Sequence, residues 1–246
     1  MTGRTFAIGD IHGDLVRLRT LLPRLPSLTS ADTLVFLGDY VDRGDSSREV
    51  VHTMMTLTRY TSAKVVCLRG NHEDAWLVVR ERGWPEFVLP EGNGCWDTLR
   101  SYTGKPTPGT LPVRPEWDAL VSGSFFPEEH VAWMRSLPIW YEDDHAIYVH
   151  AGLPMVDGRF PHPKDLADPR PMLWQRSEAF FRQYEGKRVV CGHTPTETLP
   201  DLSTHTPEDP TDAWMRSSVV AIDTGCGRGG FLTAIELPSL RVFESR

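Results

Sequence analysis

Carboxylate, histidine and asparagine side chains gather in five short segments of the chain, and each of these segments contains glycine. The segments span residues 9–13, 38–44, 69–73, 150–152 and 192–194. Carboxylate and amide oxygens and imidazole nitrogens are ligands that divalent metal ions accept in proteins. Two such ions can activate one bridging water and clamp a phosphoryl group during hydrolysis. The residue types therefore predict a two-metal hydrolase.

The first three segments each follow a short apolar run that predicts a β-strand. These runs lie at 6–8, 33–37 and 64–68. Helical patterns separate the strands: Asp14 can cap one helix, Ser46 and Glu49 form a capping-box pattern for a second, and residues 73–80 predict a third. This alternation predicts an α/β (α+β) fold with a parallel or mixed sheet that is covered on both faces.

We expect residues 1–246 to form a single domain, although the regular alternation of strands and helices does not continue past the third helix. Residues 83–126 are rich in proline and aromatic residues, and we interpret them as an irregular, partly helical insertion. Its aromatic residues favour packing over a role as a wall of the active-site groove. A helix is expected at 127–137 and a loop at 196–216. Further strands are expected at 139–141, 146–149, 189–191, 219–222, 231–237 and 241–243, with the last three antiparallel.

Composition excludes several classes of protein. The net charge is −7 and no run of lysine or arginine occurs, so the chain is a poor candidate for binding nucleic acid. No apolar run is long enough for a spanning helix and no signal-like leader is present, so we expect a cytoplasmic protein without membrane contact. The four cysteines form no C-x-x-C pair, which favours buried free thiols over a zinc site.

Six candidate metal ligands follow predicted strands, where ligands gather in open α/β sheets. They are Asp10, His12, Asp39, Asn71, His150 and His193. Lone Asp or His residues after strands are usually turn residues, but six at successive strand ends are hard to explain in that way. We expect Asp39, in the middle strand, to bridge two cations roughly 3.5–4 Å apart. The other histidines, at positions 52, 130, 145, 162 and 205, are expected to have surface or packing roles.

Four residues beside these ligands could act on a phosphate ester. Arg43 and Arg69 carry guanidinium groups that can hold a phosphate through two parallel hydrogen bonds. His72 is a candidate general acid for the leaving alkoxide. Asp42 could orient His72 and raise its basicity.

Three intact motifs identify a family resemblance. G-D-x-H-G stands at 9–13, G-D-x-V-D-R-G at 38–44 and G-N-H-E at 70–73, and further matching segments lie at 150–153, 173–176, 192–195 and 223–225. The chain resembles the phosphoprotein phosphatase family of calcineurin-like metallophosphoesterases, in its bacterial and phage branch of serine/threonine protein phosphatases. The resemblance covers about residues 5–237. It implies a β-sandwich of two mixed sheets flanked by helices.

The resemblance also assigns roles to the candidate residues. It implies that Asp10 and His12 bind one metal and that Asn71, His150 and His193 bind the other, with Asp39 between them. It adds Arg176 to Arg43 and Arg69 as phosphate-binding residues, and it makes His72 and Asp42 an acid pair. The implied cofactors are two divalent metal ions, with Mn2+ expected and Fe or Zn also known in the family.

The expected activity is metal-dependent phosphomonoesterase activity on phosphoserine, phosphothreonine and also phosphotyrosine in proteins. A metal-bridging hydroxide would attack in line while His72 protonates the leaving group. Symmetrical diadenosine tetraphosphate hydrolases are the alternative, but they typically vary the Asp-Arg pair and carry tryptophan after Gly-His. Asp42-Arg43 and Thr194-Pro195 favour the phosphatase branch. A catalytically silent phosphoprotein- or metal-binding module is a third hypothesis. No regulatory subunit is implied, because the chain lacks the C-terminal extension of the eukaryotic relatives.

Overall fold

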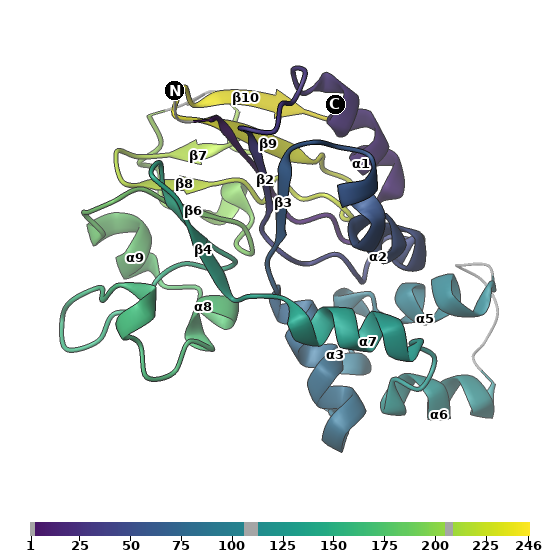
Figure 1. Ribbon diagram of the computed structural model, residues 1–246. Coiled ribbons are helices and arrows are strands. Elements are labelled where there is room, and N and C mark those ends of the chain that lie inside the picture. Colours follow the sequence, from purple (N-terminus) through teal and green to yellow (C-terminus); the bar gives the residue numbers. More distant parts are fainter. Residues whose placement is uncertain (1–2, 106–112, 205–208) are drawn as a thin grey trace.

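Two β-sheets lie face to face at the centre of the molecule, and helices cover their outer sides (Figure 1). The computed structural model describes residues 3–105, 113–204 and 209–246. Within these residues each sheet has five strands. The expected sandwich of two mixed sheets flanked by helices is therefore confirmed.

The first sheet combines the three early strands with the last two. Its strands are β1 (Thr5–Ile8), β2 (Thr33–Phe36), β3 (Lys64–Cys67), β9 (Thr233–Leu237) and β10 (Arg241–Glu244). Their order is β10-β9-β1-β2-β3; β1, β2 and β3 run parallel, and β9 and β10 are antiparallel to their neighbours. Helices α1 (Leu15–Leu21) and α2 (Ser47–Thr56) connect the parallel strands.

The second sheet corrects one expectation about strand direction. Its strands are β4 (Trp140–Glu142), β5 (Ile147–Val149), β6 (Val189–Cys191), β7 (Trp214–Met215) and β8 (Val219–Ala221), in the order β4-β5-β6-β8-β7. The prediction that the strand at 219–222 is antiparallel was only partly right. It pairs with β7 in antiparallel fashion but runs parallel to β6. The reason is β7, a short strand inside the predicted loop 196–216, which reverses the chain before β8 begins. The sheet is covered by α8 (Pro171–Trp174) and α9 (Glu178–Gln183).

Side chains of β1 show how the two layers are filled. Successive residues of a strand point to opposite faces of the sheet. Phe6 and Ile8 lie in the cluster beneath the helices, whereas Ala7 lies in the cluster between the two sheets. Because both faces of this sheet are covered, the strand is apolar at every one of these positions rather than alternating with polar residues.

Helices make up most of the chain between β3 and β4. They are α3 (Asn71–Arg82), α4 (Pro85–Val88), α5 (Cys95–Thr103), α6 (Arg114–Ser122) and α7 (Glu128–Ser136). Short 3-10 turns occur at Leu22–Arg24, Leu57–Arg59, Glu91–Asn93, Pro163–Asp165 and Thr196–Thr198. Figure 1 shows α5 and α6 beside α3 and α7, away from the sheets. The described part of the 83–126 insertion is thus mostly helical.

Aromatic residues of the insertion pack mainly against one another and against α3. The Trp76 ring on α3 is buried, with its centroid 5.2 Å from that of Phe125 and 5.1 Å from that of Phe126. Trp96 meets Trp117 edge to face at 4.7 Å. This supports the expected packing role.

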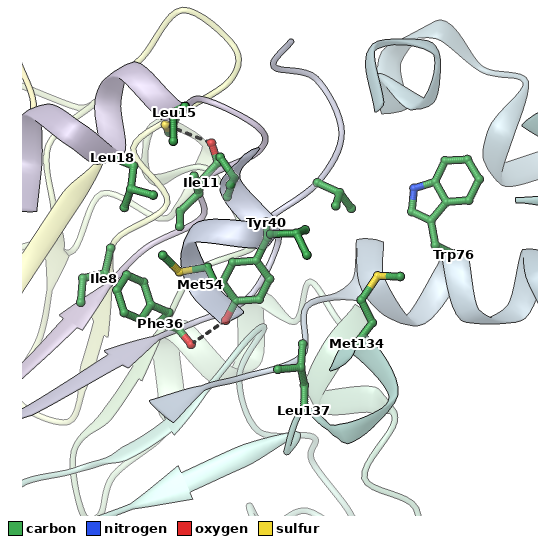
Figure 2. Packing of buried hydrophobic residues seen from close by; sticks show 14 of the residues in the cluster. Ile8, Ile11, Leu15, Leu18, Phe36, Tyr40, Met54, Trp76, Met134 and Leu137 are labelled. Atoms are coloured by element: carbon green, nitrogen blue, oxygen red, sulfur yellow. Dashed lines mark hydrogen bonds between the residues drawn. The ribbon is translucent and has the colours of Figure 1, made fainter. Parts of the chain in front are cut away.

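Tyr40 anchors the loop after β2 in the core. Figure 2 shows its ring among Phe36, Met54 and Ile11. The Tyr40 hydroxyl donates a hydrogen bond to the Leu68 carbonyl oxygen at 2.9 Å. The loop that carries Asp39 is therefore tied to the end of the neighbouring strand β3.

The helix starts agree with the sequence in one case and differ in two. The Asp14 carboxylate caps α1 by accepting the Arg17 backbone N–H at 2.9 Å. The capping box at Ser46 was wrong, because the Ser46 hydroxyl donates to Asp45 and makes no capping bond. The third helix begins at Asn71, two residues earlier than expected, because Glu73 accepts the Gly70 backbone N–H at 3.0 Å.

The four cysteines are free, as expected, although Cys67 is only partly buried. His130 has the expected packing role, since it is buried and its Nδ1 lies 2.7 Å from the Tyr102 hydroxyl. His205 lies outside the described residues. In the described part of the chain, no helix has both the length and the apolar character needed to cross a membrane.

Candidate metal centre

The structure brings all six predicted metal ligands together at one edge of the sandwich. Each is buried, with no more than 5% of its surface exposed. Asp10, Asp39 and Asn71 follow parallel strands of the first sheet, and His150 and His193 follow strands of the second. The carboxyl ends of both sheets therefore meet at this point.

Asp39 lies at the centre of the cluster. Its Oδ2 atom is 3.3 Å from His12 Nε2, and its Oδ1 atom is 3.4 Å from His150 Nε2. Potential ligand atoms form two groups that share Asp39, one with His12 and His72 and the other with His150 and His193. The two carboxylate oxygens face different groups, which is the arrangement that a carboxylate needs to lie between two cations.

Backbone carbonyl groups fix the orientation of two histidines. His12 Nδ1 is 3.0 Å from the Val41 carbonyl oxygen, and His150 Nδ1 is 2.9 Å from that of Leu37. A carbonyl oxygen only accepts, so each Nδ1 carries the hydrogen and each Nε2 presents a lone pair towards Asp39. Neutral imidazole with a free lone pair is the form that binds metal.

Asn71 and His193 complete the second group. The Asn71 Oδ1 atom is 2.9 Å from His150 Nε2 and 2.8 Å from His193 Nδ1. His193 Nε2 is buried and has no hydrogen-bond partner among the described residues. The Asp10 carboxylate accepts the His193 backbone N–H at 3.0 Å and lies 3.9 Å from His12 Nε2, so it contacts both groups.

The electrostatics of the cluster suit bound cations. Burial raises the pKa of Asp10, and the nearby charges of Asp223 and Asp39 raise it further. Burial lowers the pKa of both His12 and His193, which keeps these rings neutral. Crowded buried carboxylates beside neutral imidazoles are compensated best by divalent ions. The donor set of oxygen and nitrogen atoms therefore fits the two metals that the sequence implied.

Asp42 and His72 form a buried pair next to the cluster. The Asp42 Oδ2 atom is 2.6 Å from His72 Nδ1, and Asp42 is fully buried. Asp42 Oδ1 accepts the Thr98 hydroxyl at 2.6 Å and the Trp76 indole N–H at 2.9 Å. His72 Nε2 points towards the cluster, 3.9 Å from Asp39 Oδ2. The ring of Phe87 covers one side of His72.

The three predicted phosphate-binding arginines differ in their contacts with the cluster. Arg43 lies in the middle, where its guanidinium contacts His12 Nε2 and is 3.4 Å from His72 Nε2. Arg69 donates to the Arg135 carbonyl oxygen at 2.7 Å, and Arg176 donates to that of His193 at 2.9 Å. A carbonyl group thus holds the Arg176 guanidinium beside His193, whereas the Arg69 guanidinium contacts Arg135 on α7 and Asp74 on α3.

Glu73 has a structural role that the sequence did not reveal. Its buried carboxylate accepts the backbone N–H groups of Asp39 at 2.9 Å, Tyr40 at 2.8 Å and Val41 at 3.3 Å, in addition to that of Gly70. Burial, followed by the charge of Asp39, raises the pKa of Glu73 to about 7. The glutamate three residues after Gly70, at the start of a helix, is the sequence signal that could have indicated this role.

Two further residues near the site were not predicted to belong to it. Asp223 follows β8, is buried, and its Oδ1 accepts the Gly225 backbone N–H at 3.2 Å. Its position after another strand end was the available signal. Thr98 gave no signal, because it comes from α5 in the insertion and reaches Asp42 only through the tertiary fold.

Backbone strain concentrates at the cluster. Seven non-glycine residues of the described chain have positive φ, and five of them belong to the site. These five are His12, Asp39, Asp42, Arg43 and His193. Such conformations cost about 1–3 kcal/mol each and persist where the surrounding structure imposes them, typically at functional sites.

Comparison with known proteins identifies the family. A family model described as calcineurin-like phosphoesterase matches residues 3–197. The symmetrical bis(5'-nucleosyl)-tetraphosphatase of Dechloromonas aromatica is 24% identical over 98% of this chain and 95% of its own length. The serine/threonine-protein phosphatase SIT4 of Candida albicans is 43% identical, over only 26% of this chain and 22% of its own length.

A solved structure shows the same fold. It is the cold-active protein-tyrosine phosphatase of a Shewanella species, which matches with a TM-score of 0.58 and 18% sequence identity. The match covers 99% of this chain and 78% of that one. The match of the family model to residues 3–197 confirms the prediction of a calcineurin-like metallophosphoesterase.

Proposed function

The chain belongs to the calcineurin-like phosphoesterase family, and we propose that within this family it is a protein phosphatase. Its substrates would be phosphoserine and phosphothreonine in proteins, with phosphotyrosine as a further substrate to test. The observation that carries this proposal is the Asp42–His72 pair, because the imidazole of His72 faces the cluster of predicted metal ligands.

The pair is suited to a basic leaving group. The alkoxide of serine or threonine is strongly basic, so it needs a proton as the ester bond breaks. A nucleoside diphosphate is much less basic and can leave without being protonated. Asp42 holds the hydrogen of His72 on Nδ1 when the ring is neutral and stabilises the charged ring that carries a second proton on Nε2. His72 can therefore deliver a proton from Nε2, which is the side that faces Asp39.

The predicted ligands would hold two divalent ions, which we propose to be Mn2+. Asp10 and His12 would bind one ion, Asn71, His150 and His193 the other, and Asp39 both. When bound, the ions supply Lewis-acid activation of the phosphoryl group. The guanidinium of Arg43 is placed to neutralise the phosphoryl oxygens beside His72, because it already lies between His12 and His72.

Symmetrical dinucleotide tetraphosphate hydrolysis is a second candidate. One observation favours it: two relatives that align along 98% of the chain are symmetrical bis(5'-nucleosyl)-tetraphosphatases, whereas the match to a serine/threonine phosphatase is partial. The Asp42–His72 pair weighs against this candidate. The pair is suited to proton donation, and a proton donor is least needed when the leaving group is a nucleoside diphosphate.

A side-by-side assay separates the two candidates. Purified protein with Mn2+ is given a phosphoserine peptide, a phosphotyrosine peptide and diadenosine tetraphosphate at equal concentrations, and phosphate and ADP are measured. We expect the phosphoserine peptide to give the largest kcat/KM. Formation of two ADP per dinucleotide, with a larger kcat/KM than for either peptide, would reverse the proposal.

A further inference from the structure

A cavity of about 540 Å3 opens directly beside the metal centre. Its lining includes Arg176, Phe181, Thr194, Leu199 and Arg228. It adjoins the cluster through His193, because Thr194 is the next residue in the chain and the Arg176 guanidinium donates to the His193 carbonyl oxygen. A group attached to the reacting phosphate ester could therefore reach this cavity.

Arg228 lies on a loop that is packed against the metal centre. The loop follows β8, and a Cβ atom added to Gly227 would come within 2.6 Å of the His12 Cβ atom. The Arg228 backbone N–H is bonded to the Gly225 carbonyl oxygen at 3.0 Å. The close approach at Gly227 fixes the loop, and hence the start of the Arg228 side chain, relative to the site.

The charge around Arg228 is not balanced by a direct partner. In the described chain its guanidinium makes no hydrogen bond or ion pair with another residue, and the side chain is exposed. Burial of part of the side chain and the charge of Arg43 lower the pKa of Arg228, with Arg176 adding to the effect and Asp223 opposing it. Three guanidinium groups thus lie close to one another at the edge of the site.

Other lining groups are consistent with an anion in the cavity. Thr194 is 7% exposed, and its buried Oγ1 has no hydrogen-bond partner in the part of the chain that the structure describes. The one carboxylate in the lining, that of Glu178, is bonded to Arg182 on the same helix. Clefts lined by charge of one sign concentrate ligands of the opposite sign.

We propose that this cavity is an accessory subsite that binds an acidic side chain of the substrate next to the phosphorylated residue, with Arg228 as its main contact. The inference rests on the proposed phosphatase function and deepens it by naming the preferred peptides. A phosphopeptide with glutamate beside phosphoserine would bind the metal centre with its phosphate and Arg228 with its carboxylate.

The test compares two phosphoserine peptides that differ only in glutamate or glutamine beside the phosphoserine. We expect wild-type protein to prefer the acidic peptide by about fivefold in kcat/KM, mainly through KM, as suits an exposed ion pair. Arg228→Gln should bring the ratio close to one. The ratio should also fall as salt is raised, because salt screens exposed charges.

Arg59→Gln provides the matched control. Arg59 is exposed and lies ahead of β3, at the opposite end of the strands from the metal centre, so the same loss of charge should leave the ratio of the two peptides unaltered. Metal content and circular dichroism of Arg228→Gln check that the variant is folded. If Arg228→Gln keeps the wild-type ratio of kcat/KM between the acidic and the neutral peptide, the subsite proposal is wrong and the phosphatase proposal is unaffected. Failure to hydrolyse either peptide, with turnover of diadenosine tetraphosphate, would overturn the phosphatase function and the subsite together.

Discussion

Gly94 lies so close to Arg43 that a side chain at the glycine would displace the arginine. A Cβ atom built at Gly94 would be 2.2 Å from the Arg43 backbone nitrogen, and the Arg43 N–H donates to the Gly94 carbonyl oxygen at 3.2 Å. Gly94 belongs to the 83–126 insertion, so this helical segment supports the loop that places Arg43 and Asp42 at the site.

Gly94→Ala should therefore reduce activity strongly even under conditions in which the variant is fully folded. A shift of about 1 Å in a positioning group can cost about 100-fold in rate, and we expect a loss of about that size in kcat/KM for an aryl phosphate. Gly83→Ala is the matched control, because Gly83 also has a positive φ, of 75°, but has no atom within 4 Å of an added Cβ. Both variants should lose about 1 kcal/mol of stability from the backbone conformation, and Gly94→Ala should lose more because its added Cβ clashes with the Arg43 backbone. Equal activity in the two variants would show that the insertion does not support Arg43.

Glu73→Gln should weaken the loop that carries Asp39. Each Glu73 oxygen accepts two backbone N–H groups, so an amide NH2 in place of either oxygen leaves two buried donors without an acceptor. We expect a loss of about 2–3 kcal/mol in the free energy of unfolding, measured with urea, and weaker Mn2+ binding. Glu81→Gln, on the exposed side of the same helix, should change neither quantity measurably. Unaltered metal binding in Glu73→Gln would contradict this role.

Metal removal should affect activity and stability together. We expect purified protein to contain two divalent ions per chain, and chelation to abolish phosphatase activity and lower the melting temperature, since ligands that bind only the folded state stabilise it. Asp39→Asn should lose most of the activity and most of the chelator-sensitive stabilisation, because both groups of ligands share Asp39. Elemental analysis that finds two tightly bound ions in Asp39→Asn would contradict the bridging role.

Asp32 should control part of the acid sensitivity of the fold. Its carboxylate accepts hydrogen bonds from the backbone and side chain of Arg4 and from the Thr29 backbone. The hydrogen bond from the Arg4 side chain is the main cause that lowers the pKa of Asp32. A lowered pKa means that the stabilisation is present above the unfolded pKa of about 3.9 and is lost as the pH falls towards the folded pKa.

Asp32→Asn should thus be about 1–2 kcal/mol less stable than wild type at pH 7, with the difference shrinking below about pH 4. Urea unfolding of metal-free protein at several pH values measures this without interference from metal release. Asp144→Asn, at an exposed position, is the control. A difference in stability between Asp32→Asn and wild type that stays constant down to pH 2 would contradict this role of Asp32.

The sequence predicted the ligands better than their supports, for a physical reason. Asp10, Asp39 and Asn71 follow strands directly, so local pattern alone indicates that they meet at one sheet edge. Thr98 on α5 and Gly94, immediately before α5, lie more than 50 residues along the chain from Asp42 and Arg43, and only the tertiary fold reveals these contacts. The parallel direction of β8 depends on the two-residue strand β7, which is too short to leave a pattern.

We propose that His72, oriented by Asp42, supplies the proton to a basic leaving group. The most direct measurement is the effect of His72→Asn on a phosphoserine peptide and on p-nitrophenyl phosphate, with bound metal verified in the variant. We expect kcat to fall about 100-fold or more for the peptide and much less for the aryl ester, whose leaving group needs little protonation. Asp42→Asn should show the same asymmetry, whereas Asp39→Asn should lower both activities alike. Equal losses on the two substrates in His72→Asn, or full activity on the peptide, would contradict the claim.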